Sequence, residues 1–582
     1  METIYTTTSA TPKVLVTHNP NSKEILNYEL VTKNLDGQDI TDLWIDENNY
    51  KIYIKDGSYY YKAVFHDNVI NLNNFIDRNY PDITKLLQFV IKMAYQLSQT
   101  TNGWKEPLKI KIPTGKFLVT DTLIDTSLDV NAGKFILEGE GYQNTIIKFE
   151  PNTEKFLFNN DKIFGYTTFS NIGFISNGSG KFMNAIGGGN GNAQSLLFTG
   201  CSFNYFKTIL DVTGDTMMSE ITFRDCKIKD APENSVLFKL NNPQAVNWRF
   251  YSTDIENNFG IIFDFYAGST ISYYQGSIIS KHTTEKIIFR VNNVADPNKF
   301  GSGNSPQLQI NGVRFELRDN TKLIKIDNED VEFSAKFDNC GMGGYNLDTS
   351  IYTIDIKGKG NFIFDNCTNY QNFKFKHQVR NADSYLHPAK IKFINTCPDL
   401  ELINNGSCNE VFNTGGYPIY VFENCGLNSY YRPFGRDTFF LNNDYYKISK
   451  KIISKGSRNN GTIQEETSVV QDRVYADLGQ NTVGYKHLVS FDLPNVPIHS
   501  IKIIFDKAWQ GGYGGQTYNV KVLKTNTPDP IATGQLNTSN KLELTANTGY
   551  FLANNDKIHI QVETIEAWSQ TLGIKVFLVV EY

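Results

Sequence analysis

Apolar and polar residues alternate along most of the central part of the chain, and the alternation breaks at intervals. Within Ile221–Lys229, for example, the apolar Ile221, Phe223 and Ile228 are separated by polar residues, and the pattern is broken near Asp225. Alternation with a period of two predicts a β-strand with one buried face. Each such segment therefore predicts a strand, a bend and a second strand.

This segment recurs about every 27 residues. A repeat of that length cannot close a core by itself, so each copy must bury its apolar face against its neighbours. Successive copies would lie about 4.8 Å apart, with equivalent residues stacked in columns. The pattern predicts a parallel β-solenoid. The copies are Phe198–Cys201, Phe223–Cys226, Phe250–Thr253, Tyr273–Gly276, Ile310–Val313, Phe337–Cys340, Phe364–Cys367, Ile394–Cys397 and Phe422–Cys425.

Six of the seven cysteines share one position in this repeat. Buried thiols behave as small apolar residues, which suit the inside of a coil. The number is odd, and no two cysteines have the close spacing of a metal or redox motif. We therefore interpret the cysteines as packing residues. Because the sequence also contains no metal-ligand motif and no phosphate-binding loop, we expect neither a metal nor a cofactor.

Two regions precede the predicted coil. Residues 1–80 contain short alternating stretches, such as Lys13–Thr17 and Lys51–Lys55, between Asn, Asp and Gly turns, which predicts a small β-rich head. Residues 81–104 begin with a predicted helix that Asp82 could cap. Such a helix would cover the open end of the coil. Its apolar positions have helical spacing: Ile83, Leu86, Leu87, Val90, Ala94 and Leu97.

The coil is predicted over residues 105–452, and residues 453–582 form a separate region. That region opens with a linker rich in Gly and Asn, Ser454–Thr462, and then alternates strands and turns without the repeat. This pattern predicts a β-sandwich-like domain. Its predicted strands are Leu488–Leu493, Ile501–Phe505, Val520–Leu523, Lys557–Glu563 and Ile574–Tyr582.

Composition narrows the classes of partner. The 582 residues carry a formal net charge of -5, with a pI near 6.0, so no basic field for nucleic acid is expected. No apolar run is long enough to cross a bilayer, so we expect no membrane insertion. The start of the chain lacks a basic segment followed by an apolar one, which argues against Sec export. We expect the protein to reach the outside of a cell by lysis or assembly.

Two segments near the start of the coil, Ile110–Val119 and Leu137–Ile147, resemble the opening rungs of pectate-lyase-like right-handed β-helices. The order of head, capping helix, coil and C-terminal β domain resembles bacteriophage tailspike proteins. The resemblance implies an all-β fold with a right-handed parallel β-helix. It also implies a homotrimer that cleaves a bacterial surface polysaccharide, capsule or O-antigen, by endo-acting depolymerisation.

The same resemblance implies a location and further roles. The head would attach the protein to a tail or baseplate protein of the virion, and the C-terminal domain would serve trimerisation or carbohydrate binding. The protein would be made in the host cytoplasm and act outside the cell, at the host surface.

Two carboxylates lie on one predicted strand of the coil, Asp254 and Glu256. Residues two apart on a strand share a face and lie about 7 Å apart. Glycoside hydrolysis needs one protonated carboxyl and a second carboxylate, and separations of about 6.5–9.5 Å predict inversion. We therefore predict Asp254 and Glu256 as the catalytic pair. Glu316, two rungs from Glu256 and about 10 Å away, is the alternate partner.

The aligned rungs gather cations and tyrosines on the same face, where they could bind the glycan. We predict a substrate-binding role for Arg224, Lys227, Arg249, Tyr251, Tyr274 and Arg314. Of the aromatic residues nearby, Trp248 and Tyr273 align with inward positions and are expected in the core.

Other interpretations stay open at this point. Exposed carboxylates on such a coil are usually solvated or ion-paired, and Asp215, Glu220, Asp225, Glu233 and Asp264 are further acidic candidates. A lyase would cleave by β-elimination at a uronic acid, with cations neutralising the sugar carboxylate and Tyr251, Tyr274 or His282 as base. A spike that binds its receptor without cleaving it is the non-enzymatic alternative.

Overall fold

The computed structural model divides the chain into two compact units, Met1–Lys325 and Ile326–Tyr582. The residues that it describes are 3–5, 14–19, 24–48, 50–77, 79–100, 103–104, 106–125, 134–160, 165–188, 193–268, 270–280, 286–300, 307–328, 330–345, 351–357, 360–368, 375–378, 390–396, 419–427, 438–441, 443–445, 451–452, 468–477, 486–492, 500–505, 509–510, 517–525, 529–537, 542–546, 557–564 and 571–581.

The first unit begins with a five-stranded antiparallel sheet in the order β1-β2-β3-β5-β4. Strands β2 and β4 lie where the alternating stretches predicted them. The short helix α1 (Asp42–Glu47) begins after Thr41, whose hydroxyl accepts a hydrogen bond from the backbone N–H of Trp44, as an N-cap does. The strands are β1 (Thr3–Tyr5), β2 (Val14–His18), β3 (Ile25–Val31), β4 (Tyr53–Asp56) and β5 (Tyr59–Ala63).

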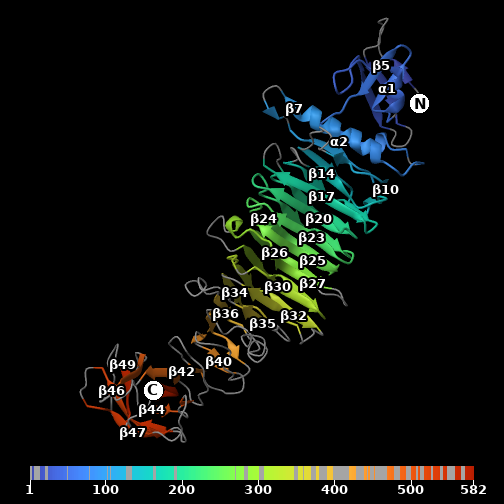
Figure 1. Ribbon diagram of the computed structural model, residues 1–582. Helices are drawn as coiled ribbons and strands as arrows, with labels where there is room; N and C mark the ends of the chain where they lie inside the picture. Colours follow the sequence, from blue (N-terminus) through green and yellow to red (C-terminus); the bar gives the residue numbers. More distant parts are fainter. Residues whose placement is uncertain are drawn as a thin grey trace. The chain divides into compact units, whose positions relative to one another are not determined.

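The predicted helix is present as α2 (Thr84–Ser98). The Asp82 carboxylate accepts a hydrogen bond of 2.8 Å from the backbone N–H of Thr84, which satisfies one of the first donors of the helix. Leu86, Leu87, Val90, Ile91 and Ala94 are buried at helical spacing. Helix α2 packs against β9 and β12, the first strands of the coil, so it covers that end as the sequence predicts (Figure 1).

Parallel strands stack turn upon turn through the rest of the first unit, which confirms the parallel β-solenoid (Figure 1). Each turn supplies three strands: two meet at a corner within one sheet, and the third belongs to a second sheet. In β24 and β26 the first two strands run on as one. Strand β6, after the head, pairs in parallel with β9 and so joins the coil.

The strand bounds in the first unit follow from this pattern. Before the corner lie β6 (Val69–Asn71), β9 (Leu108–Lys111), β12 (Phe135–Glu138), β15 (Thr168–Ser170), β18 (Leu197–Thr199), β21 (Thr222–Arg224) and β28 (Leu308–Asn311). After the corner lie β10 (Gly115–Val119), β13 (Thr145–Phe149), β16 (Gly173–Ser176), β19 (Ser202–Asn204), β22 (Lys227–Lys229) and β29 (Arg314–Arg318). Strands β24 (Trp248–Asn258) and β26 (Ile271–Ser280) span it. The second sheet contains β11 (Ile124–Asp125), β14 (Lys155–Asn160), β17 (Gly180–Gly187), β20 (Thr208–Gly214), β23 (Ser235–Asn241), β25 (Gly260–Ala267) and β27 (Lys286–Val291).

Stacked aromatic rings fill the coil. The Phe223 ring lies 4.5 Å from that of Phe198 and 5.0 Å from that of Phe250, centroid to centroid, and both pairs are nearly parallel. All three side chains are fully buried. Because equivalent residues of successive turns face each other at strand spacing, a phenylalanine in one turn packs on the phenylalanine of the next.

The corner between the first two strands has a repeated backbone conformation. In the turns from Asn171 to Asn424, the residue just before the position that cysteine often occupies has φ between 45° and 67°, in the left-handed region. Asn, Asp and Gly tolerate this region best, which explains why one of them precedes each of the five described cysteines. The corner residues are Asn171, Gly200, Asp225, Ser252, Gln275, Gly312, Asn339, Asn366, Asn395 and Asn424.

All five cysteines that the structure describes are buried, as predicted, whereas Cys397 and Cys408 lie outside the described residues. The predicted copy Ile394–Cys397 is wrong by one residue: Phe393 pairs with Phe364 and Phe422, Asn395 is the corner residue, and the buried Thr396 takes the cysteine position of that turn.

The Cys226 thiol donates to the Phe198 carbonyl of the preceding turn at 3.5 Å, and Cys201 makes the same contact with Phe169 at 3.4 Å. Burial raises the pKa of the Cys226 thiol well above its ordinary value. These thiols are packed donors and not nucleophiles.

The second unit repeats the stacking and then changes architecture. Its parallel strands are β31 (Ala335–Asp338), β34 (Asn361–Asp365), β36 (Lys390–Ile394), β37 (Ile419–Glu423) and β39 (Thr438–Leu441), with β33 (Ile354–Lys357) paired to β35 (Phe375–Gln378). The rings of Phe337, Phe364, Phe393 and Phe422 stack at 5.1–5.3 Å.

Two antiparallel sheets follow in the last part of the chain. The predicted strands are present there, and the sandwich arrangement of the two sheets stays a prediction. One sheet contains β42 (Ser468–Asp477), β50 (Thr571–Glu581), β44 (Ser500–Phe505), β48 (Leu542–Thr545) and β45 (Trp509–Gln510); the other contains β43 (Lys486–Asp492), β49 (Lys557–Thr564), β46 (Thr517–Lys524) and β47 (Ala532–Asn537). Among the described residues, no helix combines the length and apolarity needed to cross a membrane.

We expect Phe223→Ala to destabilise the coil by about 3–5 kcal/mol, because it removes a fully buried ring from the middle of a stack. Thermal unfolding followed by circular dichroism would show a lower melting temperature. Phe223→Leu, which keeps most of the side-chain volume, is the control. Its melting temperature should lie between those of the parent and the alanine variant. Equal melting of the alanine variant and the parent would contradict the role of the stack.

We expect Gly276→Ala to destabilise the coil by about 1–3 kcal/mol. Gly276 has φ +95°, and a Cβ there would lie 2.1 Å from the carbonyl oxygen of Thr253. The matched control is Gly341→Ala, because a Cβ at Gly341 meets no atom within 4 Å. Differential scanning calorimetry should separate the two variants, and similar melting of both would refute the steric explanation.

Candidate active site

The register between strands β22, β24, β26 and β29 confirms the columns that the repeat predicted. Asp254 pairs with Lys227 of the preceding turn and with Ser277 of the next, and Glu256 pairs with Lys229 and Ile279 in the same way. The columns continue into β29, where Ser277 pairs with Arg314 and Ile279 with Glu316.

The strand itself orients the two carboxylates. Ile255, between them, is fully buried, so Asp254 and Glu256 point to the outer face of the sheet. Their side chains keep 28% and 24% of their exposure, which leaves both within reach of a ligand on that face. Residues two apart on a strand lie about 7 Å from each other.

Each carboxylate has polar neighbours in the adjacent turns. The Ser277 hydroxyl donates to Asp254 at 2.8 Å, and the Lys227 ammonium lies 3.9 Å from the other oxygen of that carboxylate. The Lys229 ammonium forms a closer ion pair with Glu256, at 2.6 Å. The hydrogen bond with Glu256 raises the pKa of Lys229. Asp254 and Glu256 are therefore held in place from neighbouring rungs.

Glu316 has a different environment from the predicted pair. Its side chain is only 10% exposed and lies in an ion-pair cluster with Arg314 and Arg318. A carboxylate that is covered and held by two guanidinium groups is less accessible to substrate than Asp254 or Glu256. The repeat predicted the correct column for Glu316, but it did not predict the ion pair of Glu316 with Arg318.

Arginines and tyrosines continue the same outer face before the corner. The Tyr251 and Tyr274 rings stack at 5.3 Å with 11° between their planes, and the Arg224 guanidinium lies 5.6 Å from the Tyr251 ring centre. Tyr274 is 37% exposed. Arg249, two residues before Tyr251 on β24, is exposed and has no ion pair among the described residues. Together they form an aromatic and cationic surface beside the carboxylates.

The aromatic residues predicted inside the coil are there. Trp248 and Tyr273 are fully buried, the indole N–H donating to the Met218 carbonyl and the Tyr273 hydroxyl to the Thr253 carbonyl. Burial raises the pKa of Tyr273 well above its ordinary value. Neither residue contacts a ligand on the outer face.

A second polar column lies on the other sheet and was missed as a unit. The Arg290 guanidinium donates to both oxygens of the buried Asp264, at 2.8 and 2.6 Å, and Lys239 lies 3.4 Å from Asp211. Burial raises the pKa of Asp211. Each of these four residues stands between buried apolar residues on the third strand of its turn. Aligning the third strands in the sequence could therefore have revealed the column.

His282, one of the bases considered for a lyase, lies outside the described residues. Over the described parts of the chain, no group of three or more His, Cys, Asp or Glu side chains could hold a metal ion.

No protein-family model matches the chain, and no curated protein matches it. Solved structures with a similar fold include tailspike protein 4 of bacteriophage CBA120, as its enzymatically active domain, at 10% identity and TM-score 0.29, covering 95% of this chain and 72% of that one. The A-module of the Azotobacter vinelandii mannuronan C-5 epimerase AlgE6 matches at 11% identity and TM-score 0.40, over 64% of this chain and 98% of that one.

A third similar structure is WceF of Pantoea stewartii, a glycan biofilm modifying enzyme with a bacteriophage tailspike-like parallel β-helix fold, at 10% identity and TM-score 0.26. It covers 94% of this chain, which spans 64% of WceF. At these TM-scores the similarities have no bearing on activity. The chain is a parallel β-solenoid whose similar solved structures include phage tailspike proteins.

Proposed function

We propose that this protein binds and depolymerises a bacterial surface polysaccharide, by endo-acting hydrolysis of its glycosidic bonds. The observation that supports the proposal best is the pair of outward carboxylates, Asp254 and Glu256, on an accessible sheet face. Residues two apart on a strand are spaced by about 7 Å, and carboxyl groups that keep this spacing lie within the range of inverting glycosidases.

The chemistry follows from the two carboxyl groups. One, protonated, donates its proton to the glycosidic oxygen as the bond from the anomeric carbon to that oxygen breaks. The other, as carboxylate, takes a proton from a water molecule that attacks the anomeric carbon from the opposite face. The product has the inverted configuration. This water needs more room between the two carboxyl groups than the about 5–5.5 Å that is usual in retaining enzymes.

The neighbouring side chains would position the polymer. Tyr251 and Tyr274 offer stacked rings to the apolar faces of sugars. Arg224 and Arg249 offer cations on the same face, beside Lys227 and Arg314 of the carboxylate column. A regularly spaced face of this kind suits an extended polymer.

The proposal includes the biological setting that follows from the resemblance of the domain order to bacteriophage tailspike proteins. The protein would be a homotrimeric tailspike of a phage, attached to the tail or baseplate through its head and acting at the host surface. Light scattering of the purified chain tests the trimer, and pull-down of virion proteins with residues 1–80 present or deleted tests the attachment.

We expect Asp254→Asn and Glu256→Gln each to lower kcat by a factor of 10² or more, on the order of general acid or base catalysis, with the fold retained. Release of reducing ends from purified capsule or O-antigen measures the rate. Azide should restore cleavage by the variant that has lost the general base. A substrate with a better leaving group should restore cleavage by the variant that has lost the general acid.

The matched control for these variants is Glu138→Gln. Glu138 is an outward carboxylate of the same coil, 3.0 Å from Lys109, and its side chain is 26% exposed. This variant should keep full activity. Full activity in both Asp254→Asn and Glu256→Gln would eliminate this pair as the catalytic groups.

The exposed arginines favour a second candidate, a polysaccharide lyase. Arg249 carries a charge that no described acidic side chain balances in an ion pair, so it could neutralise the carboxylate of a uronic acid. Lyase products contain an unsaturated sugar with ultraviolet absorbance, and hydrolase products do not. Adsorption to the glycan without any fragments would instead indicate a receptor-binding spike.

We expect Arg249→Met to raise KM about ten-fold for a glycan that contains uronic acid, because the substitution removes one charge-assisted hydrogen bond. The same polymer with its carboxyl groups reduced to alcohols is the control, and its KM should not change. An equal effect on both polymers would show that Arg249 does not bind a sugar carboxylate.

A further inference from the structure

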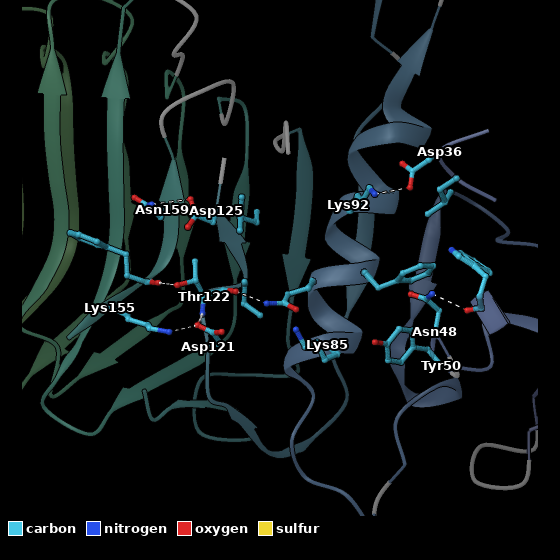
Figure 2. Close-up of a pocket in the computed structure, with 17 residues that line it drawn as sticks. Asp36, Asn48, Tyr50, Lys85, Lys92, Asp121, Thr122, Asp125, Lys155 and Asn159 are labelled. Carbon is cyan, nitrogen blue, oxygen red and sulfur yellow. Dashed lines mark hydrogen bonds and ion pairs between the residues drawn. The ribbon is translucent and has the colours of Figure 1, made fainter. Parts of the chain in front are cut away.

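A cavity of about 860 Å³ lies in the first unit, away from the carboxylate columns, where the head, helix α2 and the first turns of the coil meet. This volume is within the range of about 300–1,000 Å³ that is usual for small-molecule sites. Its lining shares no residue with the proposed active site. Figure 2 shows the helix between the head residues on one side and the coil residues on the other.

One face of α2 runs along the cavity. Lys85, Gln88, Phe89 and Lys92 all line it, and residues three, four and seven apart lie on the same side of a helix. The head contributes an aromatic wall: the Phe89 ring lies 5.4 Å from that of Tyr50 and 6.2 Å from that of Trp44.

Hydrogen bonds and ion pairs hold the walls together. The Gln88 amide donates to the Thr122 carbonyl of the coil at 2.6 Å, and Lys92 pairs with Asp36 of the head at 2.9 Å. On the coil side, Lys155 pairs with Asp121 at 2.8 Å. These contacts join helix α2 to both the head and the coil.

Several polar groups in the cavity can still form hydrogen bonds or ion pairs with a ligand. Within the described residues, neither the Lys85 ammonium nor the Tyr50 hydroxyl makes a hydrogen bond or ion pair. Asn48 uses its amide nitrogen to donate to the Trp44 carbonyl, which leaves its side-chain oxygen as an acceptor. Burial raises the pKa of Tyr50, so its hydroxyl is a donor at neutral pH. Figure 2 shows Lys85 on the helix and Tyr50 with Asn48 on the head side.

We propose that this cavity binds a short acidic saccharide of one or two units, at a site separate from the cleavage site. The rings of Trp44 and Phe89 suit the apolar face of a pyranose. The Tyr50 hydroxyl and the Asn48 oxygen can bond sugar hydroxyls, because together they supply a donor and an acceptor. The Lys85 ammonium is the cation for a sugar carboxylate.

The preference for an acidic sugar rests on one side chain, Lys85. Three lysines and three aspartates line the cavity. Lys92 pairs with Asp36 and Lys155 with Asp121, and the Asp125 carboxylate accepts a hydrogen bond from Asn159. Lys85 is the lysine without an ion pair among the described residues, although after Lys155 it also contributes to lowering the pKa of Asp121. An anion would therefore meet one available cation. A neutral sugar would still stack and hydrogen-bond, but would gain nothing from Lys85.

Isothermal titration calorimetry of the full chain with glucuronate, and with glucose as its neutral counterpart, tests the site. We expect Lys85→Met to weaken glucuronate binding at least ten-fold and to leave glucose binding unchanged. Tyr50→Phe, which keeps the ring against Phe89, should weaken both sugars several-fold. Matched controls are Lys116→Met and Tyr80→Phe, at exposed positions outside the cavity, and these should bind as the parent does.

Crystals of the full chain soaked in glucuronate would locate the sugar. Density against Phe89 and Lys85 supports the proposal. Density on the outer face of the coil alone, no binding, or unchanged affinity in both Lys85→Met and Tyr50→Phe would overturn it. The outcome is independent of the proposed hydrolysis, because Asp254→Asn and Glu256→Gln should leave binding in this cavity unchanged.

Discussion

The structure depends on parallel backbone hydrogen bonding between successive turns, held in one register. Because the register is kept, a residue at a given position in one turn lies directly beside its equivalents in the turns before and after. Each column must then accept a stack of like side chains. Phenylalanine satisfies this inside. Outside, a basic residue of one turn can lie beside an acidic residue of the next, as Lys229 does with Glu256. The left-handed corner residue keeps the two strands of each turn aligned with this register.

Much of this arrangement could be predicted from sequence because the repeat fixes the register. Aligning the bends was enough to place Asp254 beside Lys227 and Glu256 beside Lys229, and to put Trp248 and Tyr273 inside. The alignment says nothing about side-chain conformation. It therefore did not show that Arg318 helps to cover Glu316. The cavity at α2 could not be predicted either, since four segments distant in sequence form it.

Ion pairs across rungs are general in this coil, which affects how the carboxylates are interpreted. Lys109 pairs with Glu138 at 3.0 Å, and Lys111 pairs with Glu140 at the same distance. The pair of Lys229 with Glu256 is thus not distinctive by itself, and exposed pairs contribute little to stability. What distinguishes residues 224–274 is the stacked tyrosines and the exposed arginines beside the acidic residues.

The reactivity of the buried thiols can report local opening of the coil. Cys201 and Cys226 sit in successive turns, each hidden from solvent and bonded to the carbonyl of the turn before. An alkylating reagent can reach either sulfur only after neighbouring rungs have separated, since both thiols are buried. Burial also raises the pKa of the Cys226 thiol. Peptide-resolved labelling kinetics would therefore show, rung by rung, where the cylinder begins to unwind.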